Sequence, residues 1–518
     1  MRDDENISKV FCLAMVCLAL LAAFSFQGSR GLHETTEGRY AECSREMLER
    51  GNYLEPTLDY QPHFTKPPLT YWAIAGGMRL LCPNEWGVRL YNAVAFFLTV
   101  MAIAWIGATL WGKPTGVMAG LIYASSPFPV FGAYAVSTDT LLTLWGISAV
   151  LCYLKASRGR SSLEQKTWIV AMWVFFGLGF LTKGPPALIL LLPVLVWGFL
   201  RKEKKIKLAD PLGIFLFILI GFSWYVIVCF RHPELPSYFL GHEVAGRITS
   251  NSVHNHQWYK PFTVYLPVLT LGAGPWLYFG LKIIRKKRLF NPVILRSYLQ
   301  MGSYGSFLLL WLLLPLVIFF LVKSRLPLYV LPLYAPIALA AARGICVNGE
   351  ETGILRRAAM VAVLTVFALV GLEGIMSFLP NKNNMKPLYD ICMRISGGNV
   401  KEVIAFNESK LYGLQFYMDG RLQRVSPAGR ESWADGSIED TIRKMKSSAS
   451  LPSYVLISDR EQVPVLCNVL RKSGLQFLRA DNEYWGAFLI APAPPSVSGA
   501  AAGEAANGGR PAAEESGT

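Results

Sequence analysis

Five basic side chains stand directly beside apolar stretches of this sequence and are of the types that bind phosphate. Arginine offers phosphate oxygens a bidentate fork, and lysine offers them a compact point charge. Cations placed in this way suit a phosphate that is carried on a lipid. The five residues are Lys66, Lys183, Arg247, Lys323 and Arg325.

Two carboxylates, Glu37 and Asp139, occur in the same group of segments. Asp139 precedes an apolar run, where a carboxylate is costly unless it is paired or hydrated, so it is a functional candidate. It is also suited to cap the helix that follows, and the two roles are compatible. Carboxylates beside a phosphate-binding site suit the handling of an acceptor group or of an oxocarbenium-like sugar centre.

The stretch Thr65–Trp72 holds Lys66, two prolines and two aromatic residues directly before an apolar run. Pro67 and Pro68 fix two backbone φ angles, so the chain is stiff where Lys66 and Tyr71 project. Two interpretations stay open, because a double proline also serves simply to break structure before a helix. Lys183 has a similar alternative, since a lysine at a membrane interface often only reaches towards water or head groups.

Histidines give a weaker indication of a metal site. Three of the six histidines, His242, His254 and His256, fall in one polar segment. His254 and His256 alternate, which suits a strand or a loop, but the spacing identifies no third ligand. We therefore assign no metal ligand, expect no other cofactor, and leave a divalent cation as an open alternative.

The elements that must position these residues are membrane helices. The 518 residues are 53% hydrophobic and only 16% charged, with a mean hydropathy of +0.35, whereas soluble domains carry about a quarter charged residues. The apolar residues form repeated blocks, which is typical of a polytopic membrane protein. The expected spans are Val10–Phe26, Val88–Leu110, Gly116–Tyr134, Leu141–Tyr153, Trp168–Leu181, Ala187–Leu200, Pro211–Phe230, Phe262–Leu281, Phe307–Val322, Leu328–Ala342 and Ala358–Leu379.

Orientation follows from the loops between these spans. Lysine and arginine crowd into every second loop, as in Arg201–Lys207 and Lys282–Arg288. Basic loops mark the cytoplasmic side, so we expect a cytoplasmic N-terminus and candidate residues that face outward. The same clustering accounts for the net charge of +15. It makes membrane lipids the expected partners and argues against nucleic acid.

After Leu379 the sequence changes character. Short apolar runs of strand length alternate with charged helical stretches, which predicts a small α/β domain over residues 381–492 on the outer side of the membrane. Residues 493–518 are rich in Pro, Ala, Gly, Ser and Glu and are expected to form a disordered tail. Residues 1–380 would then form the membrane domain.

At the residues named above, the chain resembles a known family. The run Thr36–Glu42, followed by Lys66–Trp72, is similar to membrane glycosyltransferases of the protein-mannosyltransferase and aminoarabinose-transferase superfamily, and most of all to the bacterial lipid A aminoarabinose transferases. The resemblance covers residues 1–380. It implies a mainly α, GT-C fold with about 11–13 transmembrane helices, a polyprenyl-phosphate sugar donor, and a site at the periplasmic face of the bacterial inner membrane. Further matches follow in order at Thr138–Leu141, Gly179–Pro185, His242 with Arg247, and Lys323–Pro332.

Carried over residue by residue, the resemblance also implies roles. Lys66, Lys183 and Arg247 would hold the donor phosphate. Thr36 stands where the family often has Asp, which leaves Glu37 as the acid there. Thr65 stands where transferase members often have an acid, which weakens a metal site that would pair this position with His242. The expected reaction centre is Glu37, Arg39 and Asp139, and the expected lining residues are Tyr40, Tyr71, Tyr329, His242, Lys323 and Arg325.

The function that the resemblance implies is inverting transfer of 4-amino-4-deoxy-L-arabinose or a related sugar from polyprenyl phosphate to lipid A or another envelope acceptor. One alternative within the enzyme class is a protein O-mannosyltransferase-like enzyme or another envelope glycan transferase. The alternative from another class is a flippase or transporter of a lipid-linked sugar. Transporters place ionisable residues near the membrane midplane, whereas here they stand at the ends of spans on one side, which favours chemistry at the surface.

Overall fold

The computed structural model describes residues 2–200, 207–247, 255–286, 303–347, 352–447 and 454–490. The predicted disordered tail, residues 493–518, lies outside the described residues, as do His254 and most of the basic loop 201–207. The chain divides into two compact units. The first comprises Met1–Tyr389 with Lys410–Gly420, and the second comprises Asp390–Ser409 with Arg421–Thr518.

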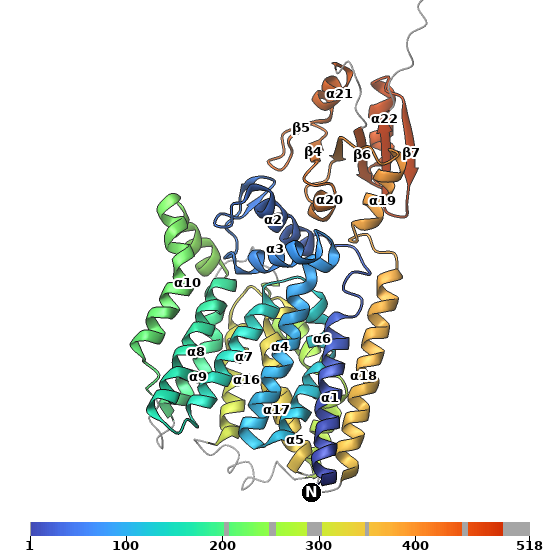
Figure 1. Ribbon diagram of the computed structural model, residues 1–518. Helices are drawn as coiled ribbons and strands as arrows, with labels where there is room; N and C mark the ends of the chain where they lie inside the picture. Colours follow the sequence, from blue (N-terminus) through green and yellow to red (C-terminus); the bar gives the residue numbers. More distant parts are fainter. Residues whose placement is uncertain are drawn as a thin grey trace, which may run out of the picture. The chain divides into compact units, whose positions relative to one another are not determined.

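The first unit is a helical bundle (Figure 1). Its elements up to residue 200 are α1 (Arg2–Phe24), α2 (Thr36–Arg50), β1 (Thr57–Leu58), β2 (Gln61–Pro62), α3 (Leu69–Leu81), α4 (Glu85–Trp111), α5 (Lys113–Ala124), α6 (Pro127–Tyr134), α7 (Asp139–Ala156), α8 (Ser162–Lys183) and α9 (Pro186–Leu200). The later elements are α10 (Pro211–Arg231), α11 (Leu235–Ser237), η1 (Tyr238–Gly246), α13 (Lys260–Leu271), α14 (Pro275–Lys286), α16 (Tyr304–Leu321), η2 (Pro327–Leu333), α17 (Tyr334–Val347), α18 (Thr352–Phe378) and α20 (Tyr412–Tyr417).

Each of the eleven expected spans coincides with a helix or with a bent pair of helices. In the described residues, six stretches are long and apolar enough to cross a membrane, and eight qualify when each bent pair counts as one span. The bent pairs are α5 with α6, at 61°, and α13 with α14, at 86°. The polytopic helical fold is therefore confirmed, while the expected number of spans includes helices that are too short or too polar to qualify alone.

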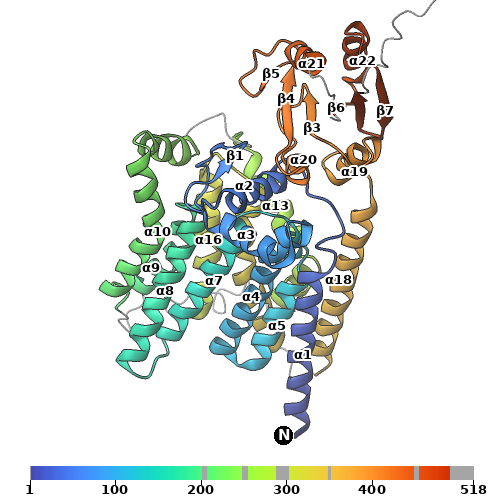
Figure 2. The same ribbon diagram turned by 45° about the horizontal axis from the view of Figure 1, so that its top comes forward.

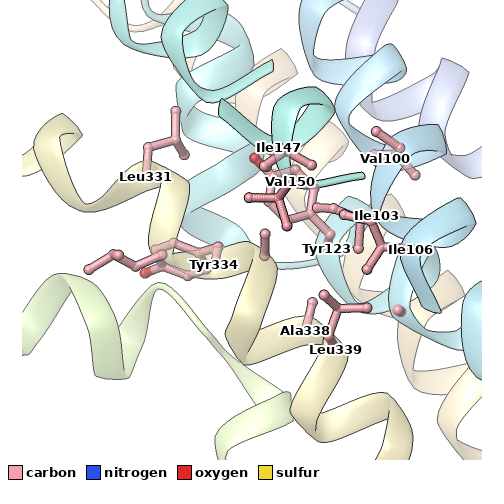
Figure 3. Close-up of a cluster of buried hydrophobic side chains, with 14 of the residues drawn as sticks. Val100, Ile103, Ile106, Tyr123, Ile147, Val150, Leu331, Tyr334, Ala338 and Leu339 are labelled. Carbon is pink, nitrogen blue, oxygen red and sulfur yellow. The ribbon is translucent and has the colours of Figure 1, made fainter. Parts of the chain in front are cut away.

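The middle of the bundle is a closely packed apolar core. Figure 3 shows Val100 and Ile103 of α4 near Tyr123 of α5, with Ile147 of α7 and Leu339 of α17 around them. Helices α4 and α5 approach closely at Gly107, where a Cβ atom would lie 2.8 Å from the Cα of Gly116. Small residues at such a crossing let backbones come together, which supplies the packing that lipid-facing helices need.

Helices α2 and α3 lie across one end of this bundle, over the ends of α4 and α7 (Figure 2). Although α2 carries many charged residues, its glutamates Glu37, Glu42 and Glu46 are buried. Burial of carboxylates requires partners, and each of the three accepts hydrogen bonds from neighbouring groups. This layer of short helices and loops holds the polar residues of the first unit at the bundle's end.

The second unit contains a six-stranded sheet in the order β5-β4-β3-β6-β8-β7. The pairs β5–β4, β4–β3 and β3–β6 are parallel, and the pairs β6–β8 and β8–β7 are antiparallel. The predicted small C-terminal α/β region is thus present. Its elements are β3 (Glu402–Phe406), β4 (Leu422–Ser426), β5 (Gly436–Ser437), α21 (Ile438–Ser447), β6 (Tyr454–Asp459), α22 (Val463–Lys472), β7 (Phe477–Asp481) and β8 (Trp485–Ile490), preceded by α19 (Lys386–Ile395).

The units differ from the predicted division at residue 380 in two respects, the first being that the first unit continues to Tyr389. Residues Lys410–Gly420, which include α20, belong to the first unit although they stand between two strands of the sheet. There the Gly413 amide donates to Glu34, and the Tyr417 hydroxyl donates to Glu85. Gly38 of α2 lies so close to Gly413 that a Cβ atom there would meet its backbone.

Candidate active site

A cavity of about 530 Å³ brings together five of the residues that the sequence singled out. They come from five separate parts of the fold: the segment before α3, the start of α7, the end of α8, the residue after η1, and helix η2. All lie at helix ends, which explains how positions far apart in the sequence converge. These five lining residues are Lys66, Asp139, Lys183, Arg247 and Tyr329.

Lys66 and Arg247 share one carboxylate, that of Glu243. The Lys66 ammonium donates to Glu243 at 3.2 Å, and Arg247 forks onto both carboxylate oxygens at 3.0 and 3.2 Å. Both Lys66 and Glu243 are largely buried, with side-chain exposures of 18% and 16%. Burial lowers the pKa of Lys66 to about 8, against the opposing effect of Glu243. The cavity thus contains two cations separated by one anion.

Lys183 and Asp139 form a second ion pair in the cavity, with the ammonium 2.5 Å from the carboxylate and both side chains below 10% exposure. The Lys183 ammonium also lies 4.4 Å from the centre of the Tyr329 ring, within cation–π range. Asp139 begins α7 and Lys183 ends α8, so each charge sits at the favourable end of its helix dipole. Gly184 stops α8 at a φ of +75°, and a side chain there would strike the Tyr225 hydroxyl.

Most of the remaining cavity wall is apolar. Aromatic rings from α8, α10, η1 and α16 line it, with Phe180 and Phe222 stacked at 4.3 Å between ring centres. A pocket that is apolar over most of its wall and carries a few converging charges suits an amphipathic ligand, with a hydrocarbon part and an anionic head. The aromatic lining residues are Phe64, Phe180, Phe222, Tyr225, Phe239, Phe319 and Tyr329.

Glu37 lies outside this cavity and is saturated with partners. It accepts from both terminal nitrogens of Arg30 at 2.8 and 3.1 Å, from Arg89 at 2.9 Å, and from the backbone amides of His33 and Val136. Burial opposes its charge, but the Arg89 and Arg30 guanidinium groups hold the pKa of Glu37 well below its usual range. This carboxylate ties the start of α2 to α4 and to the segment before Asp139.

Arg39, Tyr40 and Tyr71 form a group next to the cavity and do not line it. The two tyrosine rings are buried 5.3 Å apart. The Tyr71 hydroxyl interacts with the Thr65 side chain, next to Lys66, and Tyr40 interacts with Thr138, next to Asp139. The half-buried Arg39 acts electrostatically on both tyrosines and on His63. These residues support the loops that carry Lys66 and Asp139.

The remaining three predicted lining residues also lie outside the cavity wall. His242 is 74% exposed and stacks on the Tyr238 ring. Arg325 is buried and donates to the backbone carbonyls of Asn255 and Gln257, among others, so its charge stabilises loops. Lys323 lies beside Ser324, which lines the cavity and whose amide donates to the Arg247 carbonyl at 3.2 Å. The loop 323–325 therefore fixes the backbone at Arg247.

No group of three His, Cys, Asp or Glu side chains with metal-binding geometry occurs within the described ranges. At the position where the family often has an acid, the Thr65 hydroxyl lies 2.8 Å from the His63 ring. His242 is exposed and stacks on the Tyr238 ring. These residues do not fit a metal ion between position 65 and His242.

Glu243 is the main cavity residue that the sequence did not single out. It stands four residues before Arg247 in a helical stretch, η1, so the spacing alone brings the two side chains to one face. Tyr225 was also missed, and nothing in an apolar run distinguishes a tyrosine that lines a cavity from one in a packed core. The i, i+4 spacing was the available signal for Glu243.

Comparison with known proteins identifies relatives of the chain. A family model described as Dolichyl-phosphate-mannose-protein mannosyltransferase matches residues 65–227. The undecaprenyl phosphate-alpha-4-amino-4-deoxy-L-arabinose arabinosyl transferase of Erwinia tasmaniensis is 30% identical over 481 residues, which cover 88% of this chain and 83% of that protein. The corresponding transferase of Pectobacterium carotovorum is 32% identical over 335 residues, covering 63% of this chain and 57% of that protein.

Among solved structures, ArnT from Cupriavidus metallidurans in the apo state superposes with a TM-score of 0.74 at 17% identity, covering 94% of this chain and 98% of that one. The same protein bound to undecaprenyl phosphate gives a TM-score of 0.72 at 19% identity, covering 93% and 97%. The fold and the charged cavity at the helix ends define a GT-C membrane glycosyltransferase of bacterial type. Within that class, the chain belongs to the family of aminoarabinose (arabinosyl) transferases.

Proposed function

We propose that this enzyme transfers 4-amino-4-deoxy-L-arabinose or a related sugar from undecaprenyl phosphate to lipid A. The observation that carries the proposal is the cavity in which Lys66, Lys183 and Arg247 meet Asp139 at the end of apolar walls. The apolar part suits the polyprenyl chain and the charged end suits its phosphate. The names of the relatives supply the sugar and the lipid carrier.

The cations would act on the group that leaves. During transfer an acceptor oxygen attacks the anomeric carbon while the bond from that carbon to the donor phosphate oxygen breaks. The electron pair then stays on the phosphate, and fixed ammonium and guanidinium groups in a partly dry site stabilise this charge. Attack from the opposite face inverts the configuration of the anomeric carbon.

The acceptor decides whether a base is needed. A lipid A phosphate is already ionised near neutral pH, because such groups have a second pKa of about 6. Asp139, held by Lys183 at 2.5 Å, would then orient the reacting groups. A hydroxyl acceptor would instead need a carboxylate to take its proton. Because Glu37 is saturated by Arg30 and Arg89, we assign it a positioning role and place Asp139 at the reaction centre.

The proposed site lies at the periplasmic face of the bacterial inner membrane. Basic residues concentrate in the loops at the other ends of the helices, which is typical of the cytoplasmic side. In this orientation the N-terminus is cytoplasmic and the C-terminal α/β region, with the division near residue 380, is periplasmic. Donor and acceptor lipids would both be presented in the outer leaflet.

Mass spectrometry of lipid A from cells with and without the gene tests the acceptor and the sugar. We expect an added mass of an amino-pentose that disappears with the gene and does not return with the Lys66→Ala variant. An unchanged spectrum would favour a protein or another envelope glycan as acceptor. In liposomes, the purified enzyme should release polyprenyl phosphate, whereas a transporter would move the donor without consuming it.

The pH profile of kcat/KM tests the role of Lys66. Because the pKa of Lys66 is about 8 in the unliganded protein, the cation is present below that pH and is lost above it. We expect kcat/KM for the donor to fall above pH 8 and to approach a decline of about tenfold per pH unit. The measurement is initial rate at subsaturating donor between pH 6 and 10.

The matched control is Lys66→Arg, which keeps its charge over the whole range. Its decline should move to higher pH, whatever its absolute rate. A wild-type profile that stays flat to pH 10 would contradict the assignment of Lys66 to the donor phosphate.

A further inference from the structure

The charged groups that line the cavity do not sum to a strongly cationic site. Lys66, Lys183 and Arg247 contribute three positive charges, and Asp139 and Glu243 contribute two negative ones. The net charge of the described lining is therefore +1. Asp139 is tied to Lys183, so the carboxylate that directly neutralises the other two cations is that of Glu243.

Glu243 is held in place from three directions. Lys66 precedes α3, Arg247 follows η1, and the Tyr238 hydroxyl lies 3.4 Å from a carboxylate oxygen on the same helix. Helix η1 is a π-helix of nine residues, a rare geometry that is frequent at functional sites. The Glu243 carboxylate lies between these two cations.

We propose that Glu243 is a specificity-determining residue that sets the charge preference of the cavity, so that it holds the phosphodiester donor and releases the phosphomonoester product. This inference rests on the proposed function. A lipid-linked sugar donor is a phosphodiester with one negative charge. Loss of the sugar leaves a monoester, which carries about −1.5 to −2 charges at pH 7.

The charge count explains the preference. A site with net charge +1 matches the single charge of the diester, whereas the monoester brings a second charge close to the Glu243 carboxylate. Repulsion between like charges a few ångströms apart in a largely buried site is strong. Without Glu243, three cations would face the product with only Asp139 opposing them. Product release limits many enzymes, so this repulsion would support turnover.

Binding measurements on the full-length protein in detergent test the inference. The probes are undecaprenyl phosphate, a monoester, and its methyl ester, a diester, and the variant is Glu243→Gln. We expect Glu243→Gln to raise the affinity for the monoester by on the order of tenfold more than the affinity for the diester. Product inhibition by undecaprenyl phosphate should strengthen in parallel.

Two variants serve as controls. Glu234→Gln removes the same charge from an exposed side chain near the same loop and should leave the ratio of the two affinities unchanged. Glu243→Asp keeps the charge and should keep the preference for the diester. Both report on the charge and not on folding, which gel filtration checks separately.

An unchanged ratio in Glu243→Gln would overturn the inference while leaving the proposed function intact. A ratio that shifts towards the diester would overturn it as well. If wild-type protein bound neither lipid, the proposed function itself would fail, and the charge preference would fall with it.

Discussion

Replacing Asp139 with asparagine is expected to lower kcat by about 10²- to 10³-fold, the range seen when one preorganised electrostatic group is removed from an active site. Asp139 is the carboxylate at the proposed reaction centre, and it begins α7 inside the cavity. Its partner Lys183 would lose the counter-ion that lies 2.5 Å away, and the lysine side chain would change its conformation or bind another anion. Single-turnover rates at saturating donor measure the effect on chemistry apart from binding.

Stability must be measured beside activity, because the same change leaves a buried lysine unpaired. Lys183 is only 7% exposed, so loss of its partner should lower the melting temperature in detergent. The double variant Asp139→Asn/Lys183→Met removes both charges and should recover most of that stability. Activity should stay low in both. Near-normal turnover in Asp139→Asn would contradict the placement of Asp139 at the reaction centre.

Four charged residues of the cavity could be predicted because their segments all lie on one side of the expected membrane helices. Asp139 and Lys183 adjoin the expected spans Leu141–Tyr153 and Trp168–Leu181, whereas Lys66 and Arg247 lie in polar segments between expected spans. Consecutive membrane helices run in opposite directions, so the end of one helix and the start of the next lie on the same side of the membrane. This topology brings these residues near one another. The structure places them around one cavity.

Partners that come from distant segments could not be predicted. Nothing in the sequence joins Glu37 to Arg89, which is 52 residues away, or Arg325 to the carbonyl of Asn255. A charge that neutralises a buried neighbour has the same local pattern as a charge that binds a ligand. The sequence therefore marks Glu37 and Arg325 as candidates, and only packing separates them from the cavity residues.

The sequence also does not indicate that residues 410–420 belong to the first unit. The apolar run Leu414–Tyr417 has the length of a strand and predicts one, which is wrong, because the chain forms the short helix α20 there. The sequence also does not show that Gly413 meets Gly38. A close contact between two glycines depends on the absence of side chains on both partners. Such contacts are set by tertiary packing, which periodicity does not report.

Replacing Glu37 with glutamine is expected to lower the free energy of unfolding by about 3 kcal/mol, near the lower end of the range for breaking a buried ion pair. The amide keeps the shape but not the charge that pairs with Arg30 and Arg89. Arg89 retains the carbonyls of Gln27, Arg30 and Gly31, so the loss is partial. Denaturant or thermal unfolding in detergent at neutral pH measures it.

The depressed pKa of Glu37 sets the pH dependence of this contribution. A carboxylate whose pKa is lowered on folding stabilises the protein above its unfolded pKa, and the stabilisation is lost as the pH falls towards the folded value. The difference in the free energy of unfolding between wild type and Glu37→Gln should therefore be largest at pH 7 and should decrease below about pH 4.5. A difference that increased in acid would contradict the pairing of Glu37 with Arg30 and Arg89.

Glu49→Gln is the matched control on the same helix. Glu49 also pairs with an arginine, Arg45 at 2.7 Å, but it is 49% exposed, so loss of its charge should lower the free energy of unfolding by less than about 1 kcal/mol.

Activity per folded molecule separates a positioning role for Glu37 from a role in the chemistry. If Glu37 positions α2 and the segment before Asp139, the folded fraction of Glu37→Gln should keep a rate within about tenfold of wild type. This loss of rate is smaller than the loss expected when a catalytic group is removed. A thousandfold loss in fully folded protein would instead place Glu37 in the chemistry itself.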